Sequence, residues 1–226
     1  MRIDYAIPMR GLSGGGKPRT VGQRLALVVA GAALATTSIG CAYRGLSMPT
    51  SSAGNPSPAH AVSLFGSGTL TTPSSASKAI TYNPDLAPLG AALTAALIPS
   101  SEGSTTAEFT VSGLLPNRGY AVHAHTEACG VTGEAAGPHF QNHEDPAATP
   151  QAPSTNPEYA NPRNEIWLDV RTDTAGAGTS RTTVPFVLTD RLPGSIVVHE
   201  AMQTPTGPGE AGQAGARIAC LTLSGQ

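Results

Sequence analysis

The chain has 226 residues and a formal net charge of −2, and only 12% of its residues are charged and 4% aromatic. A nearly neutral chain this poor in Lys and Arg lacks the basic surface that nucleic-acid-binding domains carry, so we expect no nucleic-acid partner. The length permits more than one small domain, but the N-terminal part lacks the pattern of a folded unit. One domain is expected, after processing and linker segments.

The first such segment is an apolar run that ends in small residues. Residues 24–41 read RLALVVAGAALATTSIGC, and Lys17, Arg19 and Arg24 provide positive charge before the run. This layout is typical of a secretory signal. A membrane-spanning helix needs about 20 strongly apolar residues, and the polar end of this run weakens it for that role. We therefore predict a signal peptide over residues 1–41 and an exported protein.

Cys41 closes the apolar run. The sequence Ser38-Ile39-Gly40-Cys41 resembles a bacterial lipoprotein cleavage site, although such sites prefer Leu where this chain has Ser38. In one interpretation Cys41 is lipidated and anchors the mature protein to the cell membrane. In the other, the protein is simply secreted or held in the cell wall with a free Cys41. Lipidation is the favoured interpretation.

A tether is predicted to follow, over residues 42–77. This stretch is rich in Ser, Pro, Gly and Ala and has no sustained periodicity, so it buries too little apolar surface to offset the entropy of ordering. The folded domain is then predicted for residues 78–226.

Within that domain, short β-rich runs alternate with turn residues. We predict strands near residues 79–82, 91–98, 107–111, 120–125, 165–171, 181–187, 195–199 and 217–223. Many short strands with Gly and Pro turns indicate an all-β sandwich or small barrel. Residues 91–97 could instead form a helical turn, because Ala and Leu favour helix. The long stretch between His125 and Asn164 has little strand character, and loops of that length inside a domain are usually functional.

Four histidines are the candidate metal ligands. His123 and His125 are two apart in a predicted strand, so both imidazoles point to one side. Such a pair is weak evidence alone, but a loop supplies His139 and the end of an apolar strand supplies His199. An all-imidazole set suits copper, zinc or nickel better than calcium or magnesium. Copper leads by affinity, while ligand chemistry alone leaves zinc open.

Two cysteines of the domain, Cys129 and Cys220, can form a disulfide in an oxidising compartment. The alternative is two separate buried thiols, which export disfavours.

Several segments together resemble the copper–zinc superoxide dismutase family: 119–125, 129–139, 197–199 and 214–220. The resemblance extends over about residues 75–226 and implies a Greek-key β-barrel or sandwich with long metal-site loops. It implies copper on His123, His125 and His199, with His139 where the family's histidine bridges copper and zinc. It also implies a Cys129–Cys220 disulfide and a catalytic Arg217 that attracts the substrate anion beside the copper.

The zinc side departs from the family pattern. The family supplies two more histidines and an aspartate after the bridging histidine, whereas this chain has only His143 before His199. In one interpretation His139, His143 and Asp145 form a rearranged zinc site. In the other, copper is the only metal and Glu165 or Asn164 accepts a hydrogen bond from the second nitrogen of His139. We favour the second, in which His143 is an ordinary loop histidine.

The resemblance implies conversion of superoxide to oxygen and hydrogen peroxide. In that reaction His139 would release copper and take up a proton in the reduced half of the cycle, while Arg217 positions the anion. The alternative is a related copper-binding or copper-buffering protein without significant turnover, since fold alone does not establish activity. A third is a surface domain with incidental histidines. The sequence leaves the oligomeric state open.

Overall fold

The computed structural model describes residues 60–225. The predicted signal peptide, Cys41 and residues 42–59 of the predicted tether lie outside this range. Within it, no helix has the length and apolar character needed to cross a membrane.

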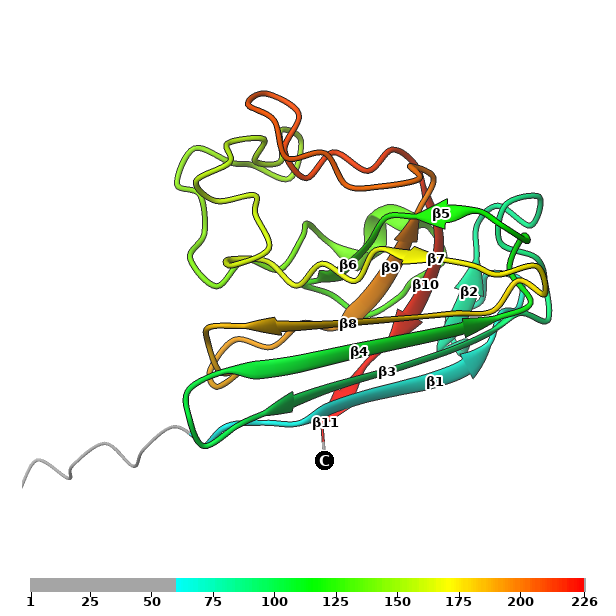
Figure 1. The fold of residues 1–226 in the computed structure, drawn as a ribbon, viewed down its shortest axis with the longest axis horizontal. Helices are drawn as coiled ribbons and strands as arrows, with labels where there is room; N and C mark the ends of the chain where they lie inside the picture. The colour runs from blue at the N-terminus through cyan, green and yellow to red at the C-terminus, as the bar shows by residue number, and fades with distance from the viewer. Residues whose placement is uncertain (1–59, 226) are drawn as a thin grey trace, which may run out of the picture. The chain divides into compact units, whose positions relative to one another are not determined.

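The described residues form an all-β domain (Figure 1). A five-stranded sheet has the order β11-β1-β3-β4-β8, a four-stranded sheet has the order β2-β10-β9-β6, and β5 pairs with β7. All these pairs are antiparallel. The strands are β1 (Leu64–Thr69), β2 (Ala79–Thr81), β3 (Ala92–Pro99), β4 (Thr105–Ser112), β5 (Gly119–Tyr120), β6 (Val122–His125), β7 (Val170–Arg171), β8 (Gly178–Val184), β9 (Ser195–His199), β10 (Arg217–Thr222) and β11 (Ser224–Gly225). The helical content of the described part is one 3-10 turn, η1 (Gly133–Ala136).

The two larger sheets share one hydrophobic core. Along β4 the buried residues alternate with exposed ones, so that Phe109 points inward and Glu108 outward. Leu93 of β3 and Phe109 of β4 belong to the same buried cluster as Ile196 of β9 and Leu221 of β10. Because apolar faces of both sheets meet in this cluster, the domain is a β-sandwich. The all-β prediction is confirmed.

The tether prediction is wrong for part of residues 60–77, because Leu64–Thr69 form β1. This strand pairs with β3 over its whole length, from Leu64 opposite Leu97 to Thr69 opposite Ala92. Its two glycines hide the alternation expected of a strand. A Cβ on Gly66 would lie 2.8 Å from the carbonyl oxygen of Thr222, so the glycine permits close approach of β1 to β10 of the four-stranded sheet.

Two other predictions need correction. Residues 91–97 do not form a helical turn, because Ala92–Leu97 pair on both sides, with β1 and with β4. Tertiary pairing here overrides the helix propensity of Ala and Leu. The strand predicted for residues 165–171 is regular only at β7, while Glu165 and Trp167 make isolated bridges to Gln141 and His123.

The four-stranded sheet is buried on both faces. Every residue of β6 and β9 is buried. Val122, Ala124 and Val198 belong to the main core, so the intervening His123 and His125 point to the opposite face. Figure 1 shows the long loops, green to yellow and orange to red, together above the strands. A buried face lined with imidazoles results.

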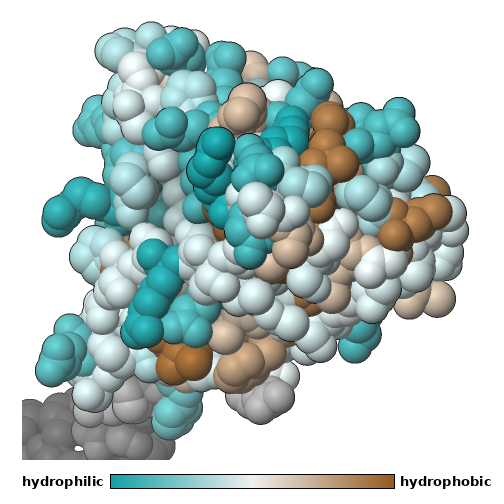
Figure 2. All heavy atoms as spheres, turned by 45° about the vertical axis from the view of Figure 1, so that its right-hand side comes forward, coloured by the Kyte–Doolittle hydropathy of each residue, from teal (hydrophilic) through white to brown (hydrophobic). Residues whose placement is uncertain are grey.

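The outer surface carries scattered apolar residues. Figure 2 shows separate small brown groups among teal and pale residues on the face in view. The large hydrophobic side chains that are exposed in the described part are Leu89, Ile98, Val131, Leu192 and Met202. Such single exposed residues are ordinary for a folded domain.

A disulfide joins Cys129 to Cys220 across 91 residues of sequence. The predicted pairing is confirmed, and the alternative of two separate thiols is wrong. The bond attaches the long loop that follows β6, near its start, to strand β10.

Replacing both cysteines by alanine should lower the free energy of unfolding by about 4 kcal/mol, because the bond restricts a long loop of the unfolded chain. Urea unfolding of the full chain, with and without reductant, measures this. Reductant should lower the urea midpoint of the wild type and leave the urea midpoint of the double variant unchanged. Equal wild-type midpoints under both conditions would contradict the expectation.

Candidate metal centre

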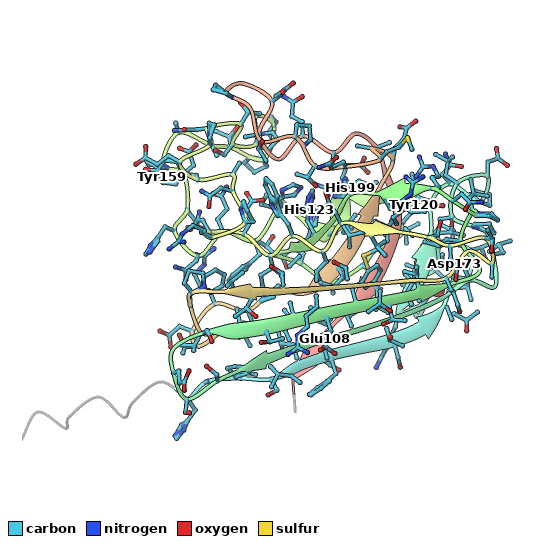
Figure 3. The ribbon with its side chains drawn as sticks, viewed as in Figure 1. Glu108, Tyr120, His123, Tyr159, Asp173 and His199 are labelled. Carbon is cyan, nitrogen blue, oxygen red and sulfur yellow. A yellow bond between two sulfur atoms is a disulfide. The ribbon has the colours of Figure 1, made fainter. Side chains whose placement is uncertain are left out.

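The four histidines predicted as ligands come together in the structure. His123, His125, His139 and His199 each offer one ring nitrogen, and these four atoms lie within 4.8 Å of one another. His123 and His125 come from β6, His199 ends β9, and His139 lies in the loop after η1. Figure 3 shows His123 and His199 next to each other, with ring centroids 5.1 Å apart.

Pairs of inner nitrogens face each other across the cluster. Nδ1 of His123 lies 3.1 Å from Nε2 of His139, and Nε2 of His125 lies 3.1 Å from Nε2 of His199. His123 and His125 are fully buried, and the side chain of His139 is 18% exposed. The geometry is that of nitrogens around a common point, where one metal ion fits.

The outer nitrogens of His125 and His199 face backbone carbonyls. Nδ1 of His125 donates to the carbonyl oxygen of Gly137 at 2.9 Å, and Nδ1 of His199 lies 3.4 Å from that of Gly215. A carbonyl only accepts, so the proton of a neutral ring lies on the outer nitrogen and the inner lone pair is free. Two lone pairs 3.1 Å apart repel unless a cation lies between them. The hydrogen bonds thus favour a metal-binding state.

Glu165 holds the outer nitrogen of His139. Its Oε2 accepts from Nδ1 of His139 at 2.9 Å and from Nε1 of Trp167 at 2.7 Å, and its Oε1 accepts from Nε2 of Gln141 at 2.8 Å. The carboxylate is almost completely buried. Three donors therefore compensate its burial, and its lone pairs are directed to protein groups.

The other residues predicted to support His139 form no hydrogen bond with its ring. The side chain of Asn164 bonds the backbone of His143 and of Tyr159, so Glu165 and not Asn164 is the acceptor for His139. His143 is exposed and is not part of the histidine cluster. Asp145 accepts from Ser154 and from the amide of Ala147. In the described part of the chain, these residues do not assemble a second metal site.

Arg217 lies beside the cluster. It pairs with His199 across β10 and β9, and a bulge between Arg217 and Ala219 interrupts the register there. Its guanidinium donates to the carbonyl oxygen of Gly133 at 2.8 Å. Bulges re-aim side chains, and here the arginine reaches the wall of a cavity.

That cavity has a volume of about 640 Å³ and connects the cluster with the surface. His139, His199, Glu165 and Arg217 contribute to its wall, together with several prolines of the long loop, among them Pro138 and Pro146. A small ligand in the cavity would thus meet two imidazoles, one guanidinium and the carboxylates of Glu144, Asp145 and Glu165.

Burial lowers the pKa values of His123, His125 and His199, and repulsion from neighbouring histidines adds to the effect. The pKa values of His123 and His125 lie well below 6.5, and that of His199 falls to about 3. The folded protein therefore keeps these rings neutral, as metal ligands must be.

The metal-free chain should lose stability as the pH falls from about 6.5 toward 3. The folded pKa values are depressed, so the unfolded state binds protons first in this window and is favoured there. The midpoint of urea unfolding, measured between pH 7 and pH 4, gives the loss of stability. His199→Leu should reduce this loss, whereas His143→Ala should leave it unchanged. Wild-type midpoints that do not change with pH would contradict this expectation.

Sequence reasoning missed several contacts of the cluster. Thr204 contacts the outer nitrogen of His123 and donates to Asp169, and Trp167 and Gln141 donate to Glu165. Trp167, the one tryptophan of the chain, stands two residues after Glu165 in an extended segment and offered a weak signal. Nothing in the sequence marks Thr204.

Comparison with known proteins adds no family assignment. No family model matches the chain, and no curated protein does.

Proposed function

We propose that this chain is an exported, copper-dependent superoxide dismutase with one metal ion per chain. The observation that carries the proposal is the cluster of four imidazoles at a cavity that Arg217 also lines. The sequence segments that resemble the copper–zinc superoxide dismutase family contribute all five of these residues. We also propose that the observed sandwich has the Greek-key barrel topology of that family.

An all-imidazole set fits copper, since nitrogen ligands can hold both of its common oxidation states. Bound copper supplies one-electron chemistry, by which two superoxide anions and two protons become one oxygen molecule and one hydrogen peroxide molecule. In that reaction one superoxide is oxidised and the other is reduced.

The residues of the chain prepare this reaction. Arg217 attracts the anion and orients it in the cavity, because a fixed positive charge in a narrow site raises the local concentration of anions. His139 is the most exposed of the four histidines. While its Nε2 is not bound to metal, that nitrogen can accept a proton from solvent and donate it to reduced substrate. Its hydrogen bond to Glu165 keeps the ring in place meanwhile.

The proposal gives zinc no role. A zinc ion at the outer nitrogen of His139 would have to displace Glu165, which lies 2.9 Å from that nitrogen and accepts two further hydrogen bonds. Structural zinc needs four ligands, but His143 is exposed and outside the cluster, and Asp145 accepts hydrogen bonds from Ser154 and Ala147. These residues do not fit a zinc ion.

Export and attachment to the cell membrane through a lipidated Cys41 complete the proposal. The Cys129–Cys220 disulfide is compatible with an oxidising compartment.

Reconstitution tests the proposal. The full chain loaded with copper should remove superoxide catalytically, whereas the metal-free and zinc-loaded chains should not. If the chain instead binds copper stoichiometrically without turnover, it is a copper-binding or copper-buffering protein and the enzyme proposal fails.

Arg217→Ala should slow superoxide removal by about tenfold or more, in line with electrostatic steering, and leave the copper content unchanged. The remaining rate should depend less on ionic strength, because the steering charge is gone. Arg217→Lys is the matched control, since it keeps the charge. Its rate should lie between the rates of the wild type and of Arg217→Ala. Stopped-flow rates at several salt concentrations measure both effects. An unchanged rate with unchanged salt dependence would exclude this role for Arg217.

A further inference from the structure

His123 differs from the other three ligands in what holds its outer nitrogen. Nε2 of His123 lies 2.6 Å from the hydroxyl of Thr204, whereas the other three outer nitrogens face oxygens that only accept. A hydroxyl both donates and accepts. Thr204 by itself therefore permits either tautomer of His123.

The choice between the tautomers has a chemical consequence. If Nε2 carries the proton, Nδ1 of His123 offers a lone pair to the metal. If Nδ1 carries it, the ring can donate to Nε2 of His139, only 3.1 Å away. That hydrogen bond would occupy two ligand nitrogens at once and would compete with the metal.

Asp169 removes this ambiguity. Its Oδ1 lies 2.7 Å from the hydroxyl of Thr204, and its Oδ2 accepts from the amide of Thr204 at 2.7 Å. The amide of Val122, next to His123 in β6, also donates to Oδ1 at 3.1 Å. A carboxylate accepts only, so the hydroxyl proton of Thr204 points to Asp169 and its lone pair faces His123. Nε2 of His123 must then donate.

We propose that Asp169 and Thr204 are positioning residues that fix His123 as the Nε2–H tautomer and so present Nδ1 to the metal. The inference rests on the proposed metal centre for its purpose, but the tautomer is a property of the metal-free protein as well. His123 is fully buried and Thr204 nearly so, hence water does not substitute for the hydroxyl.

The same contact connects the metal ligand to a loop of the cavity. Thr204 belongs to the segment between β9 and β10, which also contributes Gly212, Ala214 and Gly215 to the cavity wall. The hydrogen bonds of Asp169 to Thr204 therefore tie this loop to β6 beside the ligand.

Three variants of the full chain test the inference. Thr204→Val keeps the shape and removes the hydroxyl. Asp169→Asn keeps the shape but can donate to the hydroxyl, which then can donate to His123 and favour the wrong tautomer. Thr204→Ser keeps the hydroxyl and is the matched control. Thermal unfolding of each variant identifies any that fail to fold.

Two readouts are required. Long-range ¹H–¹⁵N spectra of the imidazole rings in the metal-free chain identify the tautomer of His123. Titration with Cu(II) against a chelator of known affinity gives the binding constant. We expect Nε2–H in the wild type and in Thr204→Ser, loss of this preference in Thr204→Val and Asp169→Asn, and a fall of about 10- to 100-fold in Cu(II) affinity for these two.

An Nδ1–H tautomer of His123 in the wild type would overturn the inference, even if no variant folded. Retention of the Nε2–H tautomer with unchanged Cu(II) affinity in both Thr204→Val and Asp169→Asn would overturn it too. Failure of the wild type to bind Cu(II) would refute the proposed metal centre, while the spectra would still decide whether Asp169 and Thr204 select the tautomer.

Discussion

We expect alanine at His123 or at His199 to abolish copper binding at stoichiometric concentrations and, with it, superoxide removal. Each ring supplies one of four nitrogens around a common point, and both residues are buried, so no solvent-exposed side chain replaces the lost ligand. Loss of a residue that only supports a ligand costs about 10- to 100-fold in metal affinity. Loss of the ligand itself should exceed that range.

His143→Ala is the control for these variants. His143 lies in the same long loop as His139 but is exposed and outside the cluster, so its replacement should leave copper content and activity at wild-type values. Metal analysis and superoxide assays on the same preparations measure both quantities. Full copper content together with full activity in His123→Ala would contradict the assignment of the site.

The second large effect is expected at Glu165. Leucine at this position leaves His139, Trp167 and Gln141 without their shared acceptor in a buried region. Each buried donor that is left without an acceptor lowers the free energy of unfolding by about 1 to 3 kcal/mol. His139 also loses the partner that orients its ring, so copper affinity should fall by about 10- to 100-fold.

Glu165→Gln separates the charge from the hydrogen bonds. Its amide oxygen can accept from His139 and Trp167, but its amide nitrogen then faces the nitrogen of Gln141, whose own oxygen accepts from the amide of Asp145. An intermediate loss is therefore expected. Urea unfolding and copper titration measure the series. Wild-type stability and affinity in Glu165→Leu would show that the network does not support the site.

The alternation of apolar and polar residues in the sequence was sufficient to predict the fold class from strands that have one buried face. The inward Phe109 and outward Glu108 of β4 follow the period of two that a half-buried strand imposes. β1 was missed because Gly66 and Gly68 carry no side chain to show that period, although the strand pairs with β3 along its whole length. Its place depends on contacts with residues far along the chain, which local composition does not encode.

The candidate metal ligands were predictable for a related reason. His123 and His125 share one face of a strand whatever its surroundings. His139 in a loop and His199 at the end of an apolar strand completed the set, and the family resemblance implied the same four residues. The residues that hydrogen-bond the outer nitrogens of these histidines were harder to predict. Glu165 was one of two candidates, and only the folded loop directs Asn164 to the backbone of His143 instead. Asp169 and Thr204 meet across 35 residues of sequence, and no local pattern announces such a contact.

The most direct test of the central claim is metal analysis of the natively loaded full chain, with superoxide removal measured on the same preparation. The account predicts about one copper ion per chain, no stoichiometric zinc, and a rate that rises in proportion to copper content across preparations. Bound zinc without copper, or stoichiometric copper without catalytic superoxide removal, would contradict it.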